Sequence, residues 1–416
     1  MSAPDLQMAG EAEEKLPKRD WILLPLLGFS TVIFLLGTLV LVSRCVFPQP
    51  AEWIGKCFFY DSHHSRRGIP NCVVTTKLTD TPILEYRLNG EGFRESTVYG
   101  RKSPGSYRIV MTGGSYTFGF GVPLRESLAT LLPKELSQRT GRKIELYNES
   151  TIAGYNVAWS FEDIIAANPD LVLWAINPGD VENTVVNPGD LAGTVVQPPQ
   201  RAERGFLGHT RFQIENALRN KPLRQAMPEI GSALNGLFIS EKGLLIDSPA
   251  TLIRDYIFQS QSEYLKIALN NSETNGFLRT QPDKYWQLRL TMFNQYEAAV
   301  EEHAHAAGVP LVITFVPNRA QAAMMSMGNW PPGYNPYKFG DDVRSMVQSH
   351  GGTYVDILSA FRDFPNAETW YYPVDGHPNA QGHTMIAKIL TDELTSGAVP
   401  ALDAADKQEA TSKTRR

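Results

Sequence analysis

The chain has 416 residues, of which 42% are hydrophobic, 20% charged and 10% aromatic. This balance excludes a disordered or low-complexity protein, because the chain has enough apolar side chains to build a core. Lys and Arg total 39 and Asp and Glu total 44, which gives a net charge of -5 and no basic excess for binding a polynucleotide. We therefore expect no nucleic acid partner.

An uncharged apolar run, WILLPLLGFSTVIFLLGTLVLV, occupies residues 21–42. As a helix it would be about 33 Å long, enough to cross the hydrocarbon core of a bilayer. A cleaved signal peptide is the alternative, but the run is longer than the apolar part of such a peptide and no A-x-A site follows it. We predict a cytoplasmic tail over residues 1–20 and one transmembrane helix over 21–43.

Basic residues flank this run on both sides. Lys15, Lys18 and Arg19 precede it, whereas Arg44 and Lys56 follow it. The larger basic cluster favours an N-terminus on the cytoplasmic side. The rest of the chain would then be anchored to the inner membrane and lie in the periplasm or outside the cell.

Three cysteines are too few for a disulfide scaffold, and none has a His or Cys neighbour at metal-ligand spacing. We expect no metal site. Outside the cytoplasm Cys57 and Cys72 could pair, and closing this loop of about 15 residues would contribute about 3 kcal/mol. Two free thiols are the other possibility, and Cys45 has no partner in either case.

Residues 44–106 show no regular pattern and are expected to form an irregular extension. From Arg108 onward short apolar runs alternate with amphipathic stretches, which is typical of βα units in a parallel sheet. The expected strands are 108–112, 144–148, 171–176, 311–316 and 353–357, and the expected helices are 127–139, 157–167, 284–307, 341–350 and 379–394. The sequence thus predicts an α/β fold: a doubly wound, flavodoxin-like parallel sheet of about five strands with helices on both faces.

Two segments lie outside this pattern. Residues 185–283 form an insertion between the third and fourth strands, and an insertion of this length is usually a lid, a binding element or a docking surface. Residues 401–416 are polar and are expected to form a disordered tail.

The first segment with chemical potential is YRIVMTGGSYTFGFGV, which places Ser115 at the carboxyl end of the first strand. In open α/β sheets this edge holds the ligand crevice. The glycine before the serine is expected to let a substrate approach closely. A phosphate-binding loop is the competing interpretation, but the segment has neither the GK[ST] ending nor the G-x-G-x-x-G spacing.

The second segment is WYYPVDGHPNAQGHTMIAKIL, in which Asp375 and His377 stand just before a helix. A serine hydroxyl becomes a nucleophile when an imidazole takes its proton, and a carboxylate orients and stabilises that imidazole. Alone, a histidine near a helix start such as His377 is more often a surface or helix-capping residue. The sequence does not show whether it meets Ser115.

Together these segments resemble the SGNH hydrolases of the GDSL esterase and lipase superfamily. The upstream YRLNGEGFRE is similar to the lead-in of membrane-anchored or periplasmic members, and DGHPNAQGH to their last block. The resemblance covers about residues 84–395, without the insertion, and implies an SGNH domain over 107–400. It implies Ser115 as nucleophile, His377 as base and Asp375 as its partner, and it implies no cofactor.

The resemblance also implies donors for the oxyanion of acyl transfer. These are the backbone N–H groups of Ser115 and Gly154, and the side chain of Asn177 with Asn183 in reserve. The pattern departs from the family here, because aligning Asp180 with the family's Asn-Asp pair puts Gly179 in the asparagine's place. Arg319, which follows the fourth strand, is a candidate contact for an anionic or sugar substrate, although an arginine in such a loop is more often simply solvated.

The implied activity is hydrolysis of O-acyl esters on a polysaccharide or cell-wall glycan. The close spacing of Asp375 and His377 is similar to that of some carbohydrate O-acetyltransferases, so transfer of the acyl group to a sugar is the alternative. A non-catalytic polysaccharide-assembly protein is a third possibility. A polysaccharide synthase or secretion complex is then a candidate partner.

Overall fold

The structure is a computed structural model. It describes residues 19–46, 54–60, 66–76, 80–96, 100–152, 157–182, 184, 260–270 and 275–403. The chain divides into two units, residues 1–50 and residues 51–416.

The first unit contains one long helix, α1 (Asp20–Val46). Its window Trp21–Thr38 has a mean hydropathy of 2.0, and among the described residues it is the one helix long and apolar enough to cross a membrane. The apolar side chains from Trp21 to Leu36 are exposed to the surroundings rather than packed in a core. Length and composition therefore fit the predicted span.

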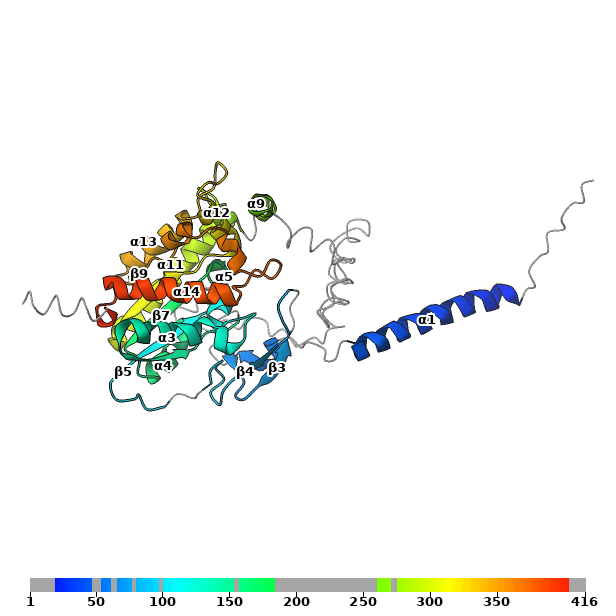
Figure 1. Cartoon of the computed structure of the whole chain (residues 1–416), viewed down its shortest axis with the longest axis horizontal. Coiled ribbons are helices and arrows are strands. Elements are labelled where there is room, and N and C mark those ends of the chain that lie inside the picture. Colours follow the sequence, from blue (N-terminus) through cyan, green and yellow to red (C-terminus); the bar gives the residue numbers. More distant parts are fainter. Residues whose placement is uncertain are drawn as a thin grey trace, which may run out of the picture. The chain divides into compact units, whose positions relative to one another are not determined.

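The second unit is built on a five-stranded parallel sheet, which confirms the predicted fold class (Figure 1). Its strands are β5 (Ser106–Gly113), β6 (Lys143–Asn148), β7 (Leu171–Ile176), β8 (Leu311–Phe315) and β9 (Thr353–Val355). Their order in the sheet is β6-β5-β7-β8-β9. The strand order therefore reverses between β5 and β7, which is where ligands bind in open α/β sheets.

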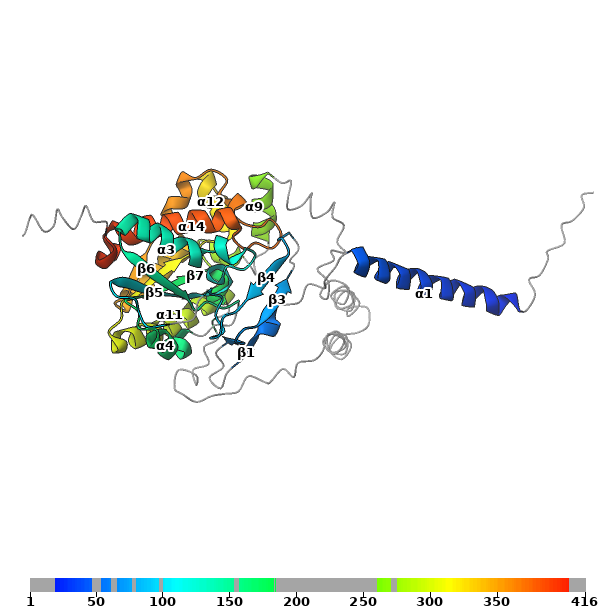
Figure 2. The same cartoon turned by 60° about the horizontal axis from the view of Figure 1, so that its bottom comes forward.

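Helices cover both faces of this sheet, as predicted (Figures 1 and 2). On one face α3 (Leu128–Thr140) packs against α14 (Ala380–Glu393). On the other, α11 (Lys284–Ala307) packs against α4 (Val157–Ala166) and α13 (Lys338–Ser349). Because both faces are covered, all side chains of β7 and β8 are buried, and these strands read as continuous apolar runs.

The segments that connect these elements or follow the last of them contain shorter helices, where η marks a 3-10 or π-helix. These are α2 (Ser115–Phe118), η2 (Leu124–Glu126), α5 (Pro178–Glu182), α9 (Gln261–Asn270), η4 (Gly276–Leu278), α12 (Arg319–Met327), η5 (Ser359–Asp363), η6 (Ala367–Trp370) and η7 (Leu394–Ala398). Helix α12 was not predicted from the sequence. Asn318 starts it by accepting a hydrogen bond from the backbone N–H of Gln321 at 2.9 Å. Most of the 185–283 insertion lies outside the described residues.

The prediction of an irregular extension over 44–106 was wrong for its described part. It contains η1 (Ile54–Cys57) and two antiparallel pairs, β1 (Phe58–Tyr60) with β2 (Arg66–Gly68) and β3 (Val73–Thr76) with β4 (Leu84–Arg87). The strands have only three or four residues, too short for an alternating pattern to stand out. We call residues 54–96 the N-terminal extension.

A disulfide joins Cys57 to Cys72 in this extension, which decides between the two possibilities left by the sequence. Cys57 is fully buried in a small apolar core. The same core takes in Phe118 and Phe120 from the segment after β5. The extension is thus packed directly on the residues that follow the first strand of the main sheet.

The boundary of the predicted C-terminal tail also moves. Residues 401 and 402 belong to η8 (Pro400–Leu402), and Leu402 is fully buried. The folded unit therefore extends past residue 400, because an apolar side chain there completes the core. Residues 404–416 lie outside the described residues.

Candidate active site

The structure brings Ser115, His377 and Asp375 together at the carboxyl edge of the sheet. Ser115 Oγ lies 2.8 Å from His377 Nε2, across a sequence separation of 262 residues. On the other side of the ring, His377 Nδ1 lies 2.6 Å from Asp375 Oδ1. Both distances are those of hydrogen bonds. The three side chains form one continuous chain from alcohol to carboxylate.

These contacts fix the state of the imidazole. A carboxylate accepts hydrogen bonds, so Nδ1 carries the proton and donates a hydrogen bond to Asp375. Nε2 then has a free lone pair and accepts from the hydroxyl of Ser115. The side chains of His377 and Asp375 are 19% and 13% exposed, so a substrate can reach a site whose charges are partly shielded from water.

Two glycines place the serine. Gly113 ends β5 with φ +150°, and a Cβ there would lie 2.3 Å from the carbonyl oxygen of Ala175 in the neighbouring strand β7. Gly114 precedes α2, and a Cβ on it would lie 1.9 Å from Asp180 Oδ1. We expected the glycine before the serine to make room for substrate, and the structure corrects this. The carboxylate of Asp180 occupies that space.

Asp180 connects the ends of β5 and β7. Its carboxylate accepts hydrogen bonds from the backbone N–H groups of Gly114 and Asn177. Burial raises the pKa of Asp180 to about 7, and these two hydrogen bonds partly oppose the shift. Asp180 thus links the serine segment to the next strand at the point where the strand order reverses.

Aromatic rings enclose the imidazole of His377. The Phe120 ring meets it edge to face with centroids 4.8 Å apart, and the Tyr116 ring does so at 5.4 Å. The Tyr116 hydroxyl also donates to the carbonyl of Gly376 at 3.2 Å. Both rings come from the segment after Ser115, so the segment that begins with Ser115 also packs on the histidine ring.

The oxyanion residues predicted from the resemblance are only partly visible. Gly154 and Asn183 lie outside the described residues. Asn177 follows β7, and its Nδ2 donates to Asp180 Oδ2 at 2.7 Å while its Oδ1 accepts from the backbone N–H of Gly179 at 2.8 Å. One of its two amide hydrogens is therefore used within α5. Ser115 begins α2, so its own N–H lies in the first helical turn, where it has no intrahelical acceptor.

Arg319 lies in the first turn of α12 and faces the loop that carries His377. Its Nη1 donates to the carbonyl of Pro373 at 2.6 Å, and its guanidinium lies 3.7 Å from the centre of the Tyr264 ring in α9. Burial lowers the pKa of Arg319. The arginine therefore supports the loop that carries His377 through its hydrogen bond to Pro373. Its contact with substrate stays a prediction.

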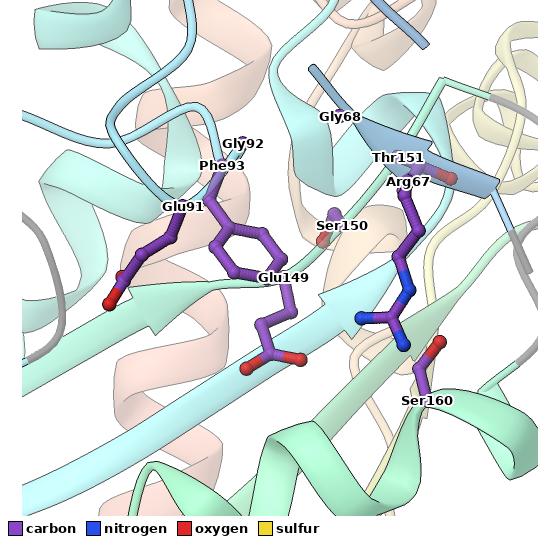
Figure 3. A pocket seen from close by; sticks show the side chains of 9 residues that line it. All are labelled: Arg67, Gly68, Glu91, Gly92, Phe93, Glu149, Ser150, Thr151 and Ser160. Carbon is purple, nitrogen blue, oxygen red and sulfur yellow. The ribbon is translucent and has the colours of Figure 1, made fainter. Parts of the chain in front are cut away.

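A small cavity lies beyond the end of β6 (Figure 3). Its lining includes Ser150, Thr151 and Ser160, whose buried hydroxyls have no hydrogen-bond partner among the described residues. The volume of about 30 Å³ is room for about one water molecule. The cavity is therefore too small to receive an acyl chain. In the part of the chain that the structure covers, no cluster of His, Cys, Asp or Glu could hold a metal ion.

Sequence reasoning missed several residues that complete the site. Asp80 accepts hydrogen bonds from the backbone N–H groups of Val374 and Asp375 at 2.6 and 3.1 Å. From the sequence, Asp180 serves only to align the Asn-Asp pair of the family, and the contact of Phe120 with the His377 ring is not predicted. The segment TDTP around Asp80 is typical of a turn and has no feature that points to residue 375.

This chain resembles proteins of known structure only distantly. No family model and no curated protein matches this sequence. Among solved structures, TesA is 10% identical with a TM-score of 0.34, covering 70% of this chain and 99% of its own. The psychrotrophic esterase EstA from Pseudoalteromonas sp. and the lipase/acylhydrolase from Enterococcus faecalis are also 10% identical with TM-scores of 0.34. Each covers 69% of this chain, and 96% and 95% of its own length respectively. At such low similarity the function has to be inferred from the site itself.

Proposed function

We propose that this protein is a serine acyl-ester hydrolase of the SGNH type. The observation that carries this proposal is the hydrogen-bonded chain from Ser115 Oγ through His377 to Asp375, with distances of 2.8 and 2.6 Å. Nucleophilic serine chemistry needs this order of groups, with the base touching both the alcohol and the acid.

The proposed reaction is acyl transfer through an acyl-enzyme. Ser115 Oγ attacks the ester carbonyl while its proton moves to His377 Nε2, and Asp375 stabilises the resulting imidazolium. The imidazolium then protonates the leaving alcohol. His377 next takes a proton from water, which attacks the acyl-enzyme and releases the carboxylic acid and Ser115. The N–H of Ser115, with Gly154 and Asn177, would donate to the oxyanion in both halves.

The proposed location is outside the cytoplasm, with α1 as a single-pass anchor in the inner membrane. Two observations support it. The window Trp21–Thr38 is apolar enough to span a bilayer. The Cys57–Cys72 disulfide fits an oxidising compartment such as the periplasm. An O-acylated polysaccharide or cell-wall glycan is the substrate class we infer for an enzyme held at that surface.

Acyl transfer to a sugar hydroxyl is the second candidate, supported by the short Asp-x-His spacing. Asp375 Oδ1 accepts from both the ring and the backbone N–H of His377, the latter at 3.3 Å, which the one-residue spacing permits. A transferase would use the same three residues and replace water by a sugar. It could act beside a polysaccharide synthase or secretion complex.

The test is hydrolysis of p-nitrophenyl acetate by the full-length chain in detergent, next to Ser115→Ala. We expect the variant to lose nearly all turnover, because the nucleophile is gone while the fold is kept. Equal rates for the two proteins would refute the proposal that the protein is a serine hydrolase. Incubation with an acyl donor and an oligosaccharide, followed by mass spectrometry, separates the two candidates: acylated sugar supports transfer, and free acid alone supports hydrolysis.

A further inference from the structure

The N-terminal extension contacts both loops that carry the candidate site. One is the serine loop, residues 113–122, and the other is the histidine loop, residues 371–379. Figure 2 shows β3 and β4 of the extension lying beside the main sheet rather than within it. The extension adds no strand to the sheet, so its contacts with the two loops call for another explanation.

On the histidine loop the contact is made by Asp80. Its Oδ2 accepts from the N–H of Val374 at 2.6 Å and its Oδ1 from the N–H of Asp375 at 3.1 Å. The two carboxylate oxygens thus bind the consecutive backbone N–H groups of Val374 and Asp375. Asp375 is the residue whose carboxylate contacts the His377 ring. Charge-assisted bonds of this kind are stronger than neutral ones and set the local backbone direction.

On the serine loop the contacts are made by Tyr86 and Arg94. The Tyr86 hydroxyl accepts from the N–H of Gly121 at 2.8 Å. Arg94, 2% exposed, donates to the carbonyls of Phe118 and Val122, at 3.0 and 2.6 Å, and also to that of Gly119. Its guanidinium lies 4.4 Å from the centre of the Tyr86 ring. Three carbonyls are thus drawn toward one buried cation.

These contacts connect the extension, through the two loops, to Ser115 and His377. The serine loop that Tyr86 and Arg94 hold contains Phe120, whose ring packs on His377. Tyr372 then joins the two loops, because its hydroxyl donates to the carbonyl of Gly121 at 2.8 Å. Phe118 and Phe120 are buried in the core of the extension, so the loop cannot shift without opening that core.

We propose that Asp80 and Tyr86 of the N-terminal extension are positioning residues that keep Asp375 and His377 aligned on Ser115. The inference rests on the proposed function and assigns a role to a segment outside the α/β domain. Neither residue touches the reacting atoms. Loss of either should lower kcat with little change in KM, because alignment of the groups, not substrate binding, is affected.

The experiment compares Asp80→Asn, Asp80→Ala and Tyr86→Phe with the wild type, all as full-length chains in detergent. The matched control is Glu85→Gln in β4, since this exposed carboxylate pairs with Arg87 of its own strand. We expect kcat for p-nitrophenyl acetate to fall about 10-fold in Asp80→Asn, about 100-fold in Asp80→Ala and about 5-fold in Tyr86→Phe. KM should stay within about 2-fold and Glu85→Gln should behave as the wild type.

Two readouts separate this role from a general loss of stability. The rate of Ser115 labelling by a fluorophosphonate, measured well below the thermal midpoint of each variant, should fall in parallel with kcat. The low-field proton resonance of His377 Nδ1–H, assigned by its loss in His377→Gln, should shift in Asp80→Asn and stay in place in Glu85→Gln. Wild-type kcat and labelling in both Asp80→Asn and Tyr86→Phe would overturn the proposal.

The same experiment distinguishes failure of the proposed function. A wild-type protein that neither hydrolyses the ester nor is labelled at Ser115 would refute the proposed hydrolase function. The positioning role is then decided by the resonance alone, which reports the His377–Asp375 bond without turnover. An unchanged resonance in Asp80→Asn would overturn it, and a shifted one would support it.

Discussion

The carboxylate of Asp180 fills the space that a side chain on Gly114 would need. A Cβ at Gly114 would lie 1.9 Å from Asp180 Oδ1, well inside contact distance, and the backbone N–H of Gly114 donates to the same carboxylate. Position 114 is therefore restricted to glycine by a neighbour in α5, the short helix that follows β7. Its φ of -92° is open to any residue, so backbone conformation is not the reason.

Gly114→Ala should consequently displace either Asp180 or the start of α2. We expect kcat to fall about 100-fold or more, because Ser115 is the next residue and a shift of about 1 Å has an effect of that size. The control is Gly100→Ala, where a Cβ meets no atom within 4 Å. Ester hydrolysis by the two variants checks the prediction, and equal activity would contradict it.

Asp375→Asn tests the tautomer of His377. An amide that turns its NH₂ toward Nδ1 favours the proton on Nε2, which then cannot accept from Ser115. We expect kcat to fall by about 10⁴-fold with the fold retained. The measurement is steady-state hydrolysis together with a thermal unfolding curve. A variant with more than a tenth of the wild-type kcat would show that Asp375 does not serve the imidazole.

His383 should make stability depend on pH. Burial lowers the pKa of His383 to about 3, with the positive charge of Arg94 acting in the same direction. The ring accepts from the N–H of Leu128 through Nδ1 at 3.2 Å and is neutral in the folded chain. Below the unfolded value of about 6.5 the unfolded chain binds the extra proton, so stability falls as pH drops from about 6.5 toward 3.

The free energy of unfolding should therefore decrease by up to about 1.4 kcal/mol per pH unit in this window on account of His383. Urea unfolding of the wild type and of His383→Asn at pH 7 and pH 5 measures the difference between them, which cancels other titrating groups. The difference should shrink at pH 5. Parallel curves at both pH values would show that His383 is not buried as a neutral ring.

Removing the disulfide should weaken the N-terminal extension. We expect Cys57→Ala with Cys72→Ala to lower the free energy of unfolding by about 3 kcal/mol, through the loop of 15 residues that the bond closes. Because Phe118 and Phe120 share the core of the extension with Cys57, ester hydrolysis should fall as well. Denaturant unfolding and kcat measured on the same sample check both effects. Unchanged stability would contradict the first.

The sequence was sufficient for those features that depend on local pattern. Continuous apolar runs such as Leu171–Ile176 predicted buried parallel strands, because a strand covered on both faces has no polar side. The uncharged run 21–42 predicted a helix long enough for a bilayer. The residue types of Ser115, Asp375 and His377, each at the end of an element, were sufficient to suggest what chemistry they could perform together.

Tertiary structure alone decided which of these residues meet and what holds them. Asp80 binds backbone groups 294 and 295 positions away, and a turn residue has no local pattern that marks such a partner. The packing of Phe120 on His377 and of Asp180 against Gly114 likewise arises between separate elements of the fold. Contacts between segments distant in the chain depend on how the layers pack, and one sequence read along its length does not contain that information.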